Sequence, residues 1–191
     1  MGNSGTQATA LDLPAVDPLP EATQAYFDIC QEKLGIIPNV LQAYAFDIAK
    51  LNAFTAMYND LMLGQSGLTK LEREMIAVVV SSENRCWYCQ VAHGAAVREL
   101  SGKPELGEAM VMNYRFADLD ERTRAMLDFS VKVTRSSAEI SESDRQALRE
   151  HGFSDRDIFD IASVVGFFSM SNRVASATGM KPNPEYHGQS R

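Results

Sequence analysis

The stretch "LTKLEREMIAVVVSSENRCWYCQVAHGAAVREL", residues 68–100, decides the fold of this 191-residue chain. Thr69 stands where a helix N-cap is expected, and Glu72 follows three residues later, which is the spacing of a capping box. The run "MIAVVV" that comes next is rich in β-branched residues and could also form a buried strand. We predict a helix, because the flanking charges suit a helix start and no other segment alternates as a partner strand would.

Helical spacing recurs along the rest of the chain. Apolar residues three and four apart predict a helix that Gly35 ends and, after it, a longer helical stretch that is interrupted near Asp47. Four later segments each open with a residue typical of helix starts; they are residues 103–114, 119–136, 141–152 and 154–179. We therefore predict an all-α, multi-helix domain over residues 21–180, with a flexible N-terminal arm over residues 1–20 and a C-terminal tail over residues 181–191.

A weak internal similarity links two of these segments. Residues 68–80 and 119–131, fifty-one positions apart, share Leu, Arg, Met and Val at four of thirteen aligned positions. A repeat of this kind would give two similar helical halves. Only the first half would carry the paired cysteines.

Composition narrows the classes of function. The formal net charge is −7, which disfavours nucleic acid and anionic membrane surfaces as partners because phosphate would be repelled. No segment has the length and hydropathy of a membrane span, and no signal peptide is recognisable, so we expect a cytoplasmic protein. Three cysteines are too few and odd in number for a disulfide framework, and a C-x-x-C pair in a reducing compartment indicates redox chemistry or metal binding.

Two of those cysteines and one histidine form a cluster. On an α-helix, Cys86, Cys89 and His93 lie within about 60° of one another and so share a face. A cap from Asn84 or Ser82 would place Cys86 in the first helical turn, where the positive end of the helix dipole lowers a thiol pKa. His93 stacks one turn after Cys89 and can hydrogen-bond the sulfur or relay a proton.

Two other interpretations of the cluster stay open. Cysteine is among the most buried residue types, so the pair could simply fill the core, as Cys30 is expected to do on its own helix. The two cysteines and His93 could also bind Zn²⁺, with a fourth ligand from Glu74, His151 or His187. Structural zinc sites usually draw on two separated ligand pairs, and the sequence holds no second pair.

The segment "LEREMIAVVVSSENRCWYCQVAHGAAVREL" resembles the alkyl hydroperoxidase D (AhpD) family, within the wider carboxymuconolactone decarboxylase group. The family motif is Glu, eleven residues, Cys-x-x-Cys, three residues, His, and Glu74, Cys86, Cys89 and His93 match it at every position. The resemblance runs from "LGIIPN" to "SNRVASATG", about three quarters of the chain, and is closest to the peroxidase-related branch.

The resemblance implies an all-α homo-oligomer with thiol peroxidase or disulfide reductase activity that requires no metal, haem or flavin cofactor. Cys89 would be the peroxidatic thiol, Cys86 the resolving thiol, His93 the proton acceptor and Glu74 the carboxylate that completes the relay. A helical wheel alone does not distinguish Glu74 from Glu72.

One position departs from the pattern of some members of the family. Those members have a histidine just before the second cysteine, where this chain has Tyr88, so we expect a weaker proton supply to a departing alkoxide. Aromatic residues of the chain could line an apolar channel for an organic peroxide; they are Trp87, Tyr88, Phe116, Phe167 and Phe168.

The expected partners are a peroxide substrate and a thiol or dithiol reductant, with the two cysteines cycling between dithiol and disulfide. A disulfide reductase using the same thiols, and a non-enzymatic helical oligomer with a Cys/Cys/His metal site, are the alternatives. Decarboxylation of a lactone is disfavoured, because a redox pair would have no evident task in it.

Overall fold

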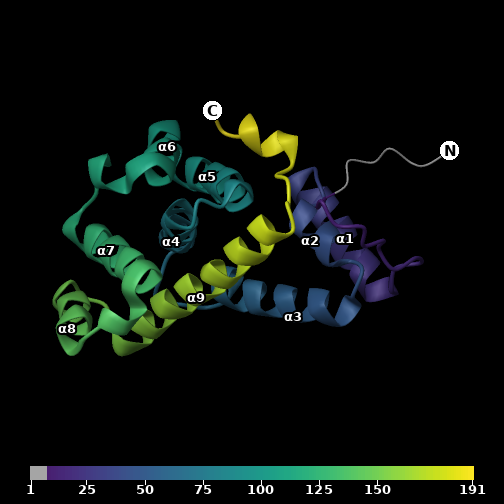
Figure 1. Ribbon diagram of the computed structural model, residues 1–191. Helices are drawn as coiled ribbons and strands as arrows, with labels where there is room; N and C mark the ends of the chain where they lie inside the picture. The colour runs from purple at the N-terminus through teal and green to yellow at the C-terminus, as the bar shows by residue number, and fades with distance from the viewer. Residues whose placement is uncertain (1–7) are drawn as a thin grey trace.

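The computed structural model describes residues 8–191, and this part of the chain contains helices and no strand, which confirms the all-α prediction (Figure 1). The α-helices are α1 (Glu21–Leu34), α2 (Asn39–Tyr44), α3 (Ile48–Tyr58), α4 (Lys70–Glu83), α5 (Trp87–Ser101), α6 (Pro104–Asn113), α7 (Glu121–Ser136), α8 (Glu142–Glu150) and α9 (Asp155–Ala177). Shorter turns are the π-helical η1 (Asn59–Leu63) and the 3-10 helices η2 (Tyr114–Phe116), η3 (Ser137–Glu139) and η4 (Pro184–His187).

Helix α4 lies at the centre of the molecule. It packs against α5, α6, α7 and α9, which surround it in Figure 1. Its apolar run is buried on every side, and Ile76, Ala77, Val78 and Val80 each have 0% of their surface exposed. A helix that is apolar all round belongs in a core, so the β-branched run "MIAVVV" reflects central position rather than strand structure.

The start of α4 is fixed by the predicted capping box. The Glu72 backbone N–H donates to the Thr69 hydroxyl at 3.2 Å, and the Thr69 N–H donates to the Glu72 carboxylate at 2.7 Å. These bonds satisfy N–H groups that have no partner within the helix itself. The sequence signal for this helix start is confirmed.

The predicted breaks also stand where the sequence puts them. Gly35 ends α1 with φ of 72°, a left-handed conformation that glycine adopts without strain. Asp47 separates α2 from α3, because its side chain accepts a hydrogen bond from the Lys50 N–H at 3.1 Å and so caps α3. Cys30 is buried among apolar residues of α1, α2 and α3, as expected.

Helix α5 crosses α6 at a point where the backbones come close. A Cβ atom on Gly107 would stand 2.5 Å from the Cγ atom of Arg98 and 2.9 Å from the Gly94 carbonyl oxygen. Only glycine fits such an approach. Gly94 directly follows His93, so this contact fixes the part of α5 that carries the histidine.

The two segments with weak sequence similarity, in α4 and α7, pack against each other and share one structural device. Arg73 of α4 donates to the carbonyl oxygens of Leu61 and Gly64, in the segment that precedes its helix. Arg124 of α7 occupies the aligned position and donates to the Ala117 carbonyl oxygen at 3.0 Å, again in the preceding segment. Descent from a common repeat remains a prediction.

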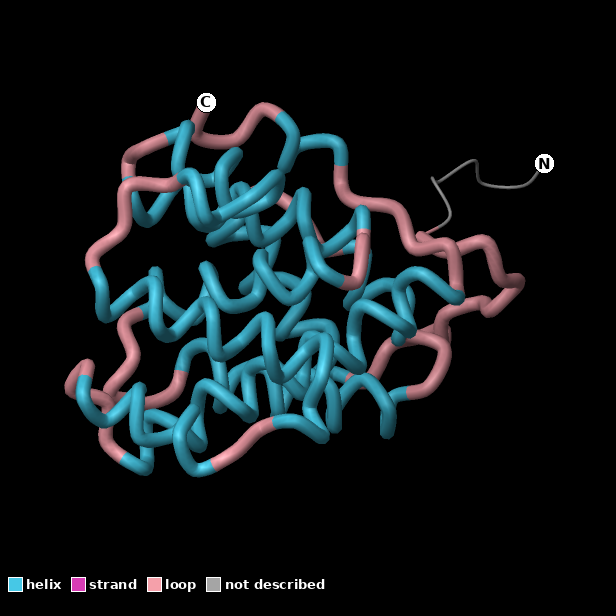
Figure 2. Tube along the Cα trace, turned by 60° about the vertical axis from the view of Figure 1, so that its left-hand side comes forward, coloured by secondary structure: helices cyan, strands magenta, loops and turns pink. Residues whose placement is uncertain are grey.

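The first described residues pack against the C-terminal end of α9 and the segment that follows it. Residues 8–20 form no helix, and the Ala10 N–H donates to the Thr178 carbonyl at 2.8 Å while the Lys181 N–H donates to the Ala8 carbonyl at 3.1 Å. Residues 1–7 of the predicted N-terminal arm lie outside the described part. Figure 2 shows loops mainly at the periphery of the helix bundle. In the described residues no helix has the length and apolar character needed to span a bilayer.

Truncation of the central helix should be costly. We expect Ile76→Ala to lower the free energy of unfolding by about 2–5 kcal/mol, because the side chain is fully buried and its loss leaves a cavity. Met112→Ala, at a side chain that is 80% exposed, should change it by less than about 0.5 kcal/mol. Urea unfolding of both variants measures the difference, and equal losses would contradict the central position of α4.

Candidate active site

The turn between α4 and α5 sets the position of the first cysteine. The Cys86 N–H donates to the Ser81 carbonyl at 2.9 Å and the Arg85 N–H to the Ser82 carbonyl at 3.0 Å, the two bonds of a Schellman motif. Arg85 has a φ of 53°, in the left-handed region where a non-glycine residue is strained. The motif ends α4 and lets α5 begin immediately, with Cys86 as its N-cap.

The predicted cap of α5 is therefore wrong. Asn84 is the C-terminal cap of α4, and the Ser82 hydroxyl donates to the Val111 carbonyl at 2.6 Å. Cys86 itself is the residue at the helix start. The expectation that its sulfur lies near the positive end of the α5 dipole still holds, because the N-cap residue lies at that end.

Both sulfur-bearing residues are buried, with Cys86 1% and Cys89 2% exposed. They share a small cluster that also contains Tyr88, Ala175 and Met180. This cluster joins the start of α5, the end of α9 and the segment that follows α9. The thiol pair thus lies beneath the C-terminal region, in contact with partly buried residues of α2.

The pKa values of the two thiols shift in opposite directions. The Cys89 thiol donates to the Cys86 sulfur, and this bond, against the opposing effect of burial, lowers the pKa of Cys86 to about 6. The Cys89 backbone N–H and the Ser176 side chain also favour the thiolate form of Cys86. The Cys86 side chain makes no regular capping hydrogen bond to the first turn of α5. His93 adds a smaller electrostatic contribution.

The pKa of Cys89 shifts in the opposite direction. Its hydrogen bond to Cys86 and its burial raise the pKa of Cys89 well above the ordinary thiol value. Asn172 and Ser171 of α9 hydrogen-bond the same sulfur and oppose that rise. In the reduced pair the first negative charge therefore rests on Cys86, with Cys89 holding the shared proton.

His93 and Glu74 form a close pair between α5 and α4. Nδ1 of His93 lies 2.6 Å from Oε2 of Glu74, and both side chains are only slightly exposed, at 13% and 12%. The Phe168 ring meets the imidazole edge-on, with 4.6 Å between ring centroids. A carboxylate on one ring nitrogen fixes the orientation of the imidazole and leaves Nε2 for proton transfer.

A helical wheel does not distinguish Glu74 from Glu72, but the structure gives the two side chains different partners. Glu72 faces the start of α4, where it bonds Thr69 and forms an ion pair with Arg122. Glu74 faces His93. The structure thus brings Glu74 to His93 and places Cys86 beside Cys89, four side chains from two adjacent helices.

The aromatic residues expected to line a channel do not act as one group. Phe167 and Phe168 pack together with centroids 5.3 Å apart, and Phe168 reaches the site through His93. Phe116 is 87% exposed on η2, so its predicted place in an apolar channel is wrong. Trp87 is 57% exposed and lies against the ring of His187.

Tyr88, between the two cysteines, points away from solvent. It is 4% exposed, and its hydroxyl oxygen accepts a hydrogen bond from the Val40 N–H of α2 at 3.1 Å. Burial raises its pKa well above the usual value for tyrosine, so the phenol stays neutral. Tyr88 therefore ties α2 to the thiol pair and keeps its own proton available for donation.

The alternative zinc site has no ligand set of its own in the described residues. Across residues 8–191, no three His, Cys, Asp or Glu side chains stand together in an arrangement suited to a metal ion. His151 contacts the Ala147 carbonyl at the end of α8, and His187 lies beside Trp87.

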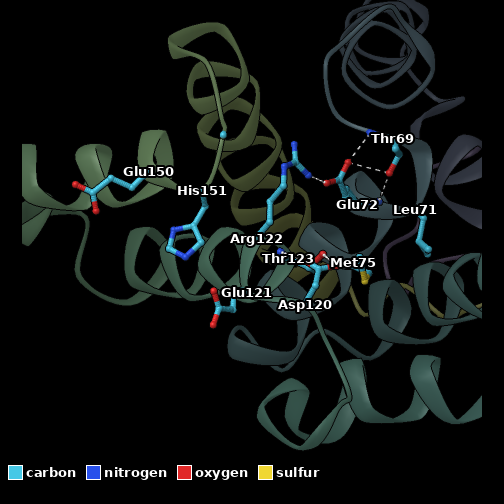
Figure 3. A pocket seen from close by; sticks show the side chains of 11 residues that line it. Thr69, Leu71, Glu72, Met75, Asp120, Glu121, Arg122, Thr123, Glu150 and His151 are labelled. Carbon is cyan, nitrogen blue, oxygen red and sulfur yellow. Dashed lines mark hydrogen bonds and ion pairs between the residues drawn. The ribbon is translucent and has the colours of Figure 1, made fainter.

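Two surface hollows differ in their distance from the motif residues along the chain. A wide hollow of about 830 Å³ lies at the N-terminal ends of α4 and α7, where Glu72 pairs with Arg122, and it includes none of the four motif residues (Figure 3). A smaller hollow of about 340 Å³ adjoins the first turn of α5. Trp87 and Gln90 line it together with Tyr186 and His187 of η4.

The tail that forms this second hollow is held to α5. Arg98, 5% exposed, donates to the Tyr186 carbonyl at 2.8 Å and to the Gln189 carbonyl at 2.9 Å. The predicted tail, residues 181–191, therefore packs beside the thiol segment.

Comparison with known proteins identifies the family and supports the fold. The sequence model of the carboxymuconolactone decarboxylase family matches residues 50–110, which contain all four motif residues. A peroxidase-related protein from Silicibacter sp. TM1040, described as uncharacterized, is 71% identical over 99% of each chain, with a TM-score of 0.95. A second, from Ralstonia eutropha JMP134, described as an alkylhydroperoxidase AhpD core, is 43% identical over 96% of this chain and 97% of its own, with a TM-score of 0.93.

The chain belongs to the carboxymuconolactone decarboxylase family, as one of its AhpD-like, peroxidase-related members. The debrominase Bmp8 shares the fold at a TM-score of 0.77 over 98% of this chain and 98% of its own, but only 17% of the sequence. No curated protein is significantly similar in sequence.

The charge distribution predicts a pH dependence. In a Cys30→Ser background, the thiolate absorbance of the reduced protein should rise as pH increases through about 6, because Cys86 loses its proton there. Cys89→Ala removes the donating thiol, so this rise should move to higher pH, toward the ordinary thiol range. Identical titration curves with and without Cys89 would contradict the shared-proton geometry.

Proposed function

We propose that this protein is a thiol peroxidase that reduces organic hydroperoxides or hydrogen peroxide through a Cys86–Cys89 dithiol/disulfide cycle. One observation carries the proposal: two buried thiols lie three residues apart at the start of α5, and one turn further along the same helix His93 pairs with Glu74 and could relay a proton. Family membership supports the same class of chemistry, since two relatives are described as peroxidase-related.

The reaction has two steps on the protein. The Cys89 thiolate attacks the terminal oxygen of the peroxide, the O–O bond breaks, and Cys89 becomes a sulfenic acid while the alkoxide leaves and takes up a proton. Cys86 then attacks the Cys89 sulfur, forming the disulfide and releasing water. The net change is two thiols plus peroxide to disulfide, alcohol and water. A thiol or dithiol partner must return two electrons.

The resting charge on Cys86 fits a resolving role in this cycle. For Cys89 to attack, its proton must pass to the Cys86 sulfur along the hydrogen bond that joins them. A thiolate of higher pKa is intrinsically the stronger nucleophile, so the rarer Cys89 thiolate is the more reactive one. The competing assignment makes Cys86 the thiol that attacks the peroxide.

His93 and Glu74 would complete the proton path. In this proposal the imidazole accepts or returns the proton that the thiols and alkoxide exchange, while Glu74 holds the ring in place and stabilises the imidazolium form. Tyr88, which stands where some members of the family have a histidine, keeps a neutral hydroxyl next to α2, with its oxygen on the Val40 N–H.

A homo-oligomer in the cytoplasm is the setting we propose. On α9, Phe159 is 70% and Met170 44% exposed, and association of subunits would cover these two apolar side chains. The three cysteines are unpaired, which suits a reducing compartment.

Disulfide reduction is the second candidate, and one observation favours it. A thiol of lowered pKa at a helix N-terminus in a Cys-x-x-Cys pair is typical of thiol–disulfide exchange. Competition between a peroxide and a small disulfide for the reduced protein distinguishes the two activities.

A thiol map tests the main proposal. One equivalent of an organic hydroperoxide added to reduced protein should link Cys86 to Cys89 and leave Cys30 free, as read by mass spectrometry after blocking of free thiols. In Cys86→Ser the cycle should stop at a sulfenic acid on Cys89, which a dimedone-type probe would trap. Thiols that stay reduced under these conditions would rule out peroxidase chemistry.

The carboxylate offers a matched pair of substitutions. Glu74→Gln should lower peroxide turnover by roughly 10²-fold or more, the scale of acid–base catalysis, with a small change in melting temperature. Glu72→Gln, on the same helix, should instead reduce stability, because it weakens the capping box and the pair with Arg122. Steady-state rates and thermal unfolding of both variants provide the measurement, and equal turnover in the two would remove Glu74 from the relay.

A further inference from the structure

The smaller hollow, of about 340 Å³, lies where α5, α6 and the C-terminal tail meet, at the top of Figure 1. Its volume is in the range of small-molecule sites. Its apolar lining includes Trp87 and Val91 of α5 and Val111 and Met112 of α6. Trp87 is 57% and Met112 80% exposed, so apolar surface is open to solvent at this hollow.

The charged side chains that line the hollow do not balance. Arg98 of α5 and Arg191 of the tail are accompanied by one carboxylate, Glu108 of α6, and by His187. Glu108 forms an ion pair with Arg191 at 2.9 Å, which leaves no carboxylate side chain of the lining for Arg98. The chain as a whole has a formal net charge of −7, so the hollow is a cationic exception on an acidic protein.

Arg98 is a buried cation without a counter-ion. It is 5% exposed, and within residues 8–191 no carboxylate forms an ion pair with it. Its Nε donates to the Gln189 carbonyl at 2.9 Å and its Nη2 to the Tyr186 carbonyl at 2.8 Å. Buried charges are normally paired with an opposite charge, so this guanidinium has a place for an anion.

Each of the two arginines keeps one terminal nitrogen for a ligand. Within the described residues, Nη1 of Arg98 makes no hydrogen bond, yet it is not one of the fully buried atoms that lack a partner, so open space lies beside it. Arg191 donates through Nε to the His187 carbonyl and through Nη1 to Glu108, and its Nη2 has no partner in that part of the chain. Burial and the charge of Arg191 lower the pKa of Arg98, against the effect of Glu108, but a guanidinium keeps its proton in a protein.

We propose that this hollow is a binding site for a small organic acid, with the carboxylate held by Arg98 and Arg191 and the apolar body lying against Trp87. The planar fork of a guanidinium matches the two oxygens of a carboxylate. An inorganic anion would neutralise the arginines but leave Trp87 and Met112 uncovered, so an organic acid fits both parts of the lining. The inference concerns binding and does not depend on the proposed thiol chemistry.

The ligand would join two segments that already touch. Arg98 belongs to α5 and Arg191 to the tail, and the Gln189 side chain donates to the Glu99 carboxylate of α5 at 2.8 Å beside them. A carboxylate shared by the two arginines would add a charged link between the tail and α5. Hydrogen exchange of the tail, residues 181–191, should therefore slow when the site is filled.

Trp87 gives a direct readout of binding, because it is the only tryptophan in the chain. Phenylacetate added to the full-length protein should produce a saturable change in tryptophan emission. Phenylacetamide, which has a similar shape and no charge, should bind about tenfold more weakly, since hydrogen bonds to a charged group are lost. Isothermal titration calorimetry measures the same binding without relying on the tryptophan.

Two substitutions at one ion pair should act in opposite directions. Arg191→Gln removes a ligand-binding charge and should weaken phenylacetate binding by about tenfold, whereas Glu108→Gln frees Arg191 and should strengthen it. Both side chains are about half exposed, at 52% and 48%, so the fold should tolerate the changes. Arg156→Gln is the matched control, because it removes the same charge from an exposed ion pair on α9 and should leave the affinity unchanged.

Three results would overturn the assignment. The first is the absence of saturable phenylacetate binding by both fluorescence and calorimetry. The second is equal affinity for phenylacetamide, which would make the hollow an apolar surface only. The third is an affinity that neither Arg191→Gln nor Glu108→Gln alters. These measurements use no peroxide, so their failure would leave the proposed peroxidase function to its own test.

Discussion

A helix whose middle is apolar on every side has to be enclosed, and the arrangement of this molecule follows from enclosing the run Met75–Val80 of α4. Four helices pack around α4, and its side chains are buried from Met75 as far as Ser81, two residues before the helix ends at Glu83. The Schellman turn at that end leaves no spacer before α5, so the first cysteine begins where the central helix stops. Glu74, on the same helix, meets His93 because α4 and α5 are adjacent. Core packing and active-site geometry therefore share one element.

The thiol pair shows how neighbours of the same chemical type become different. Cys86 and Cys89 are equally buried and only three residues apart, yet one sulfur accepts hydrogen bonds at a helix start while the other donates. Their asymmetry comes from position on α5 and from the polar face of α9. Neither the burial nor the motif alone would separate their roles.

Local signals in the sequence were sufficient for the helices and for the shared face of the motif. The capping box at Thr69 and the break at Asp47 act within one turn, which is why pattern and structure agree there. The choice of Glu74 over Glu72 needed the direction of α5, and the donors Ser171 and Asn172 lie some eighty residues away in sequence. Contacts between distant elements leave no periodic signal.

The depth of the thiol pair has a consequence for oxidative damage. With Cys89 2% exposed and the Cys86 sulfur in hydrogen-bond contact, a sulfenic acid formed here meets the resolving thiol without any diffusion. A second peroxide molecule would have to enter the buried site within the lifetime of that intermediate. In the proposed cycle, this arrangement would direct oxidation to the reversible disulfide rather than to sulfinic or sulfonic acid, so the fold itself would limit overoxidation.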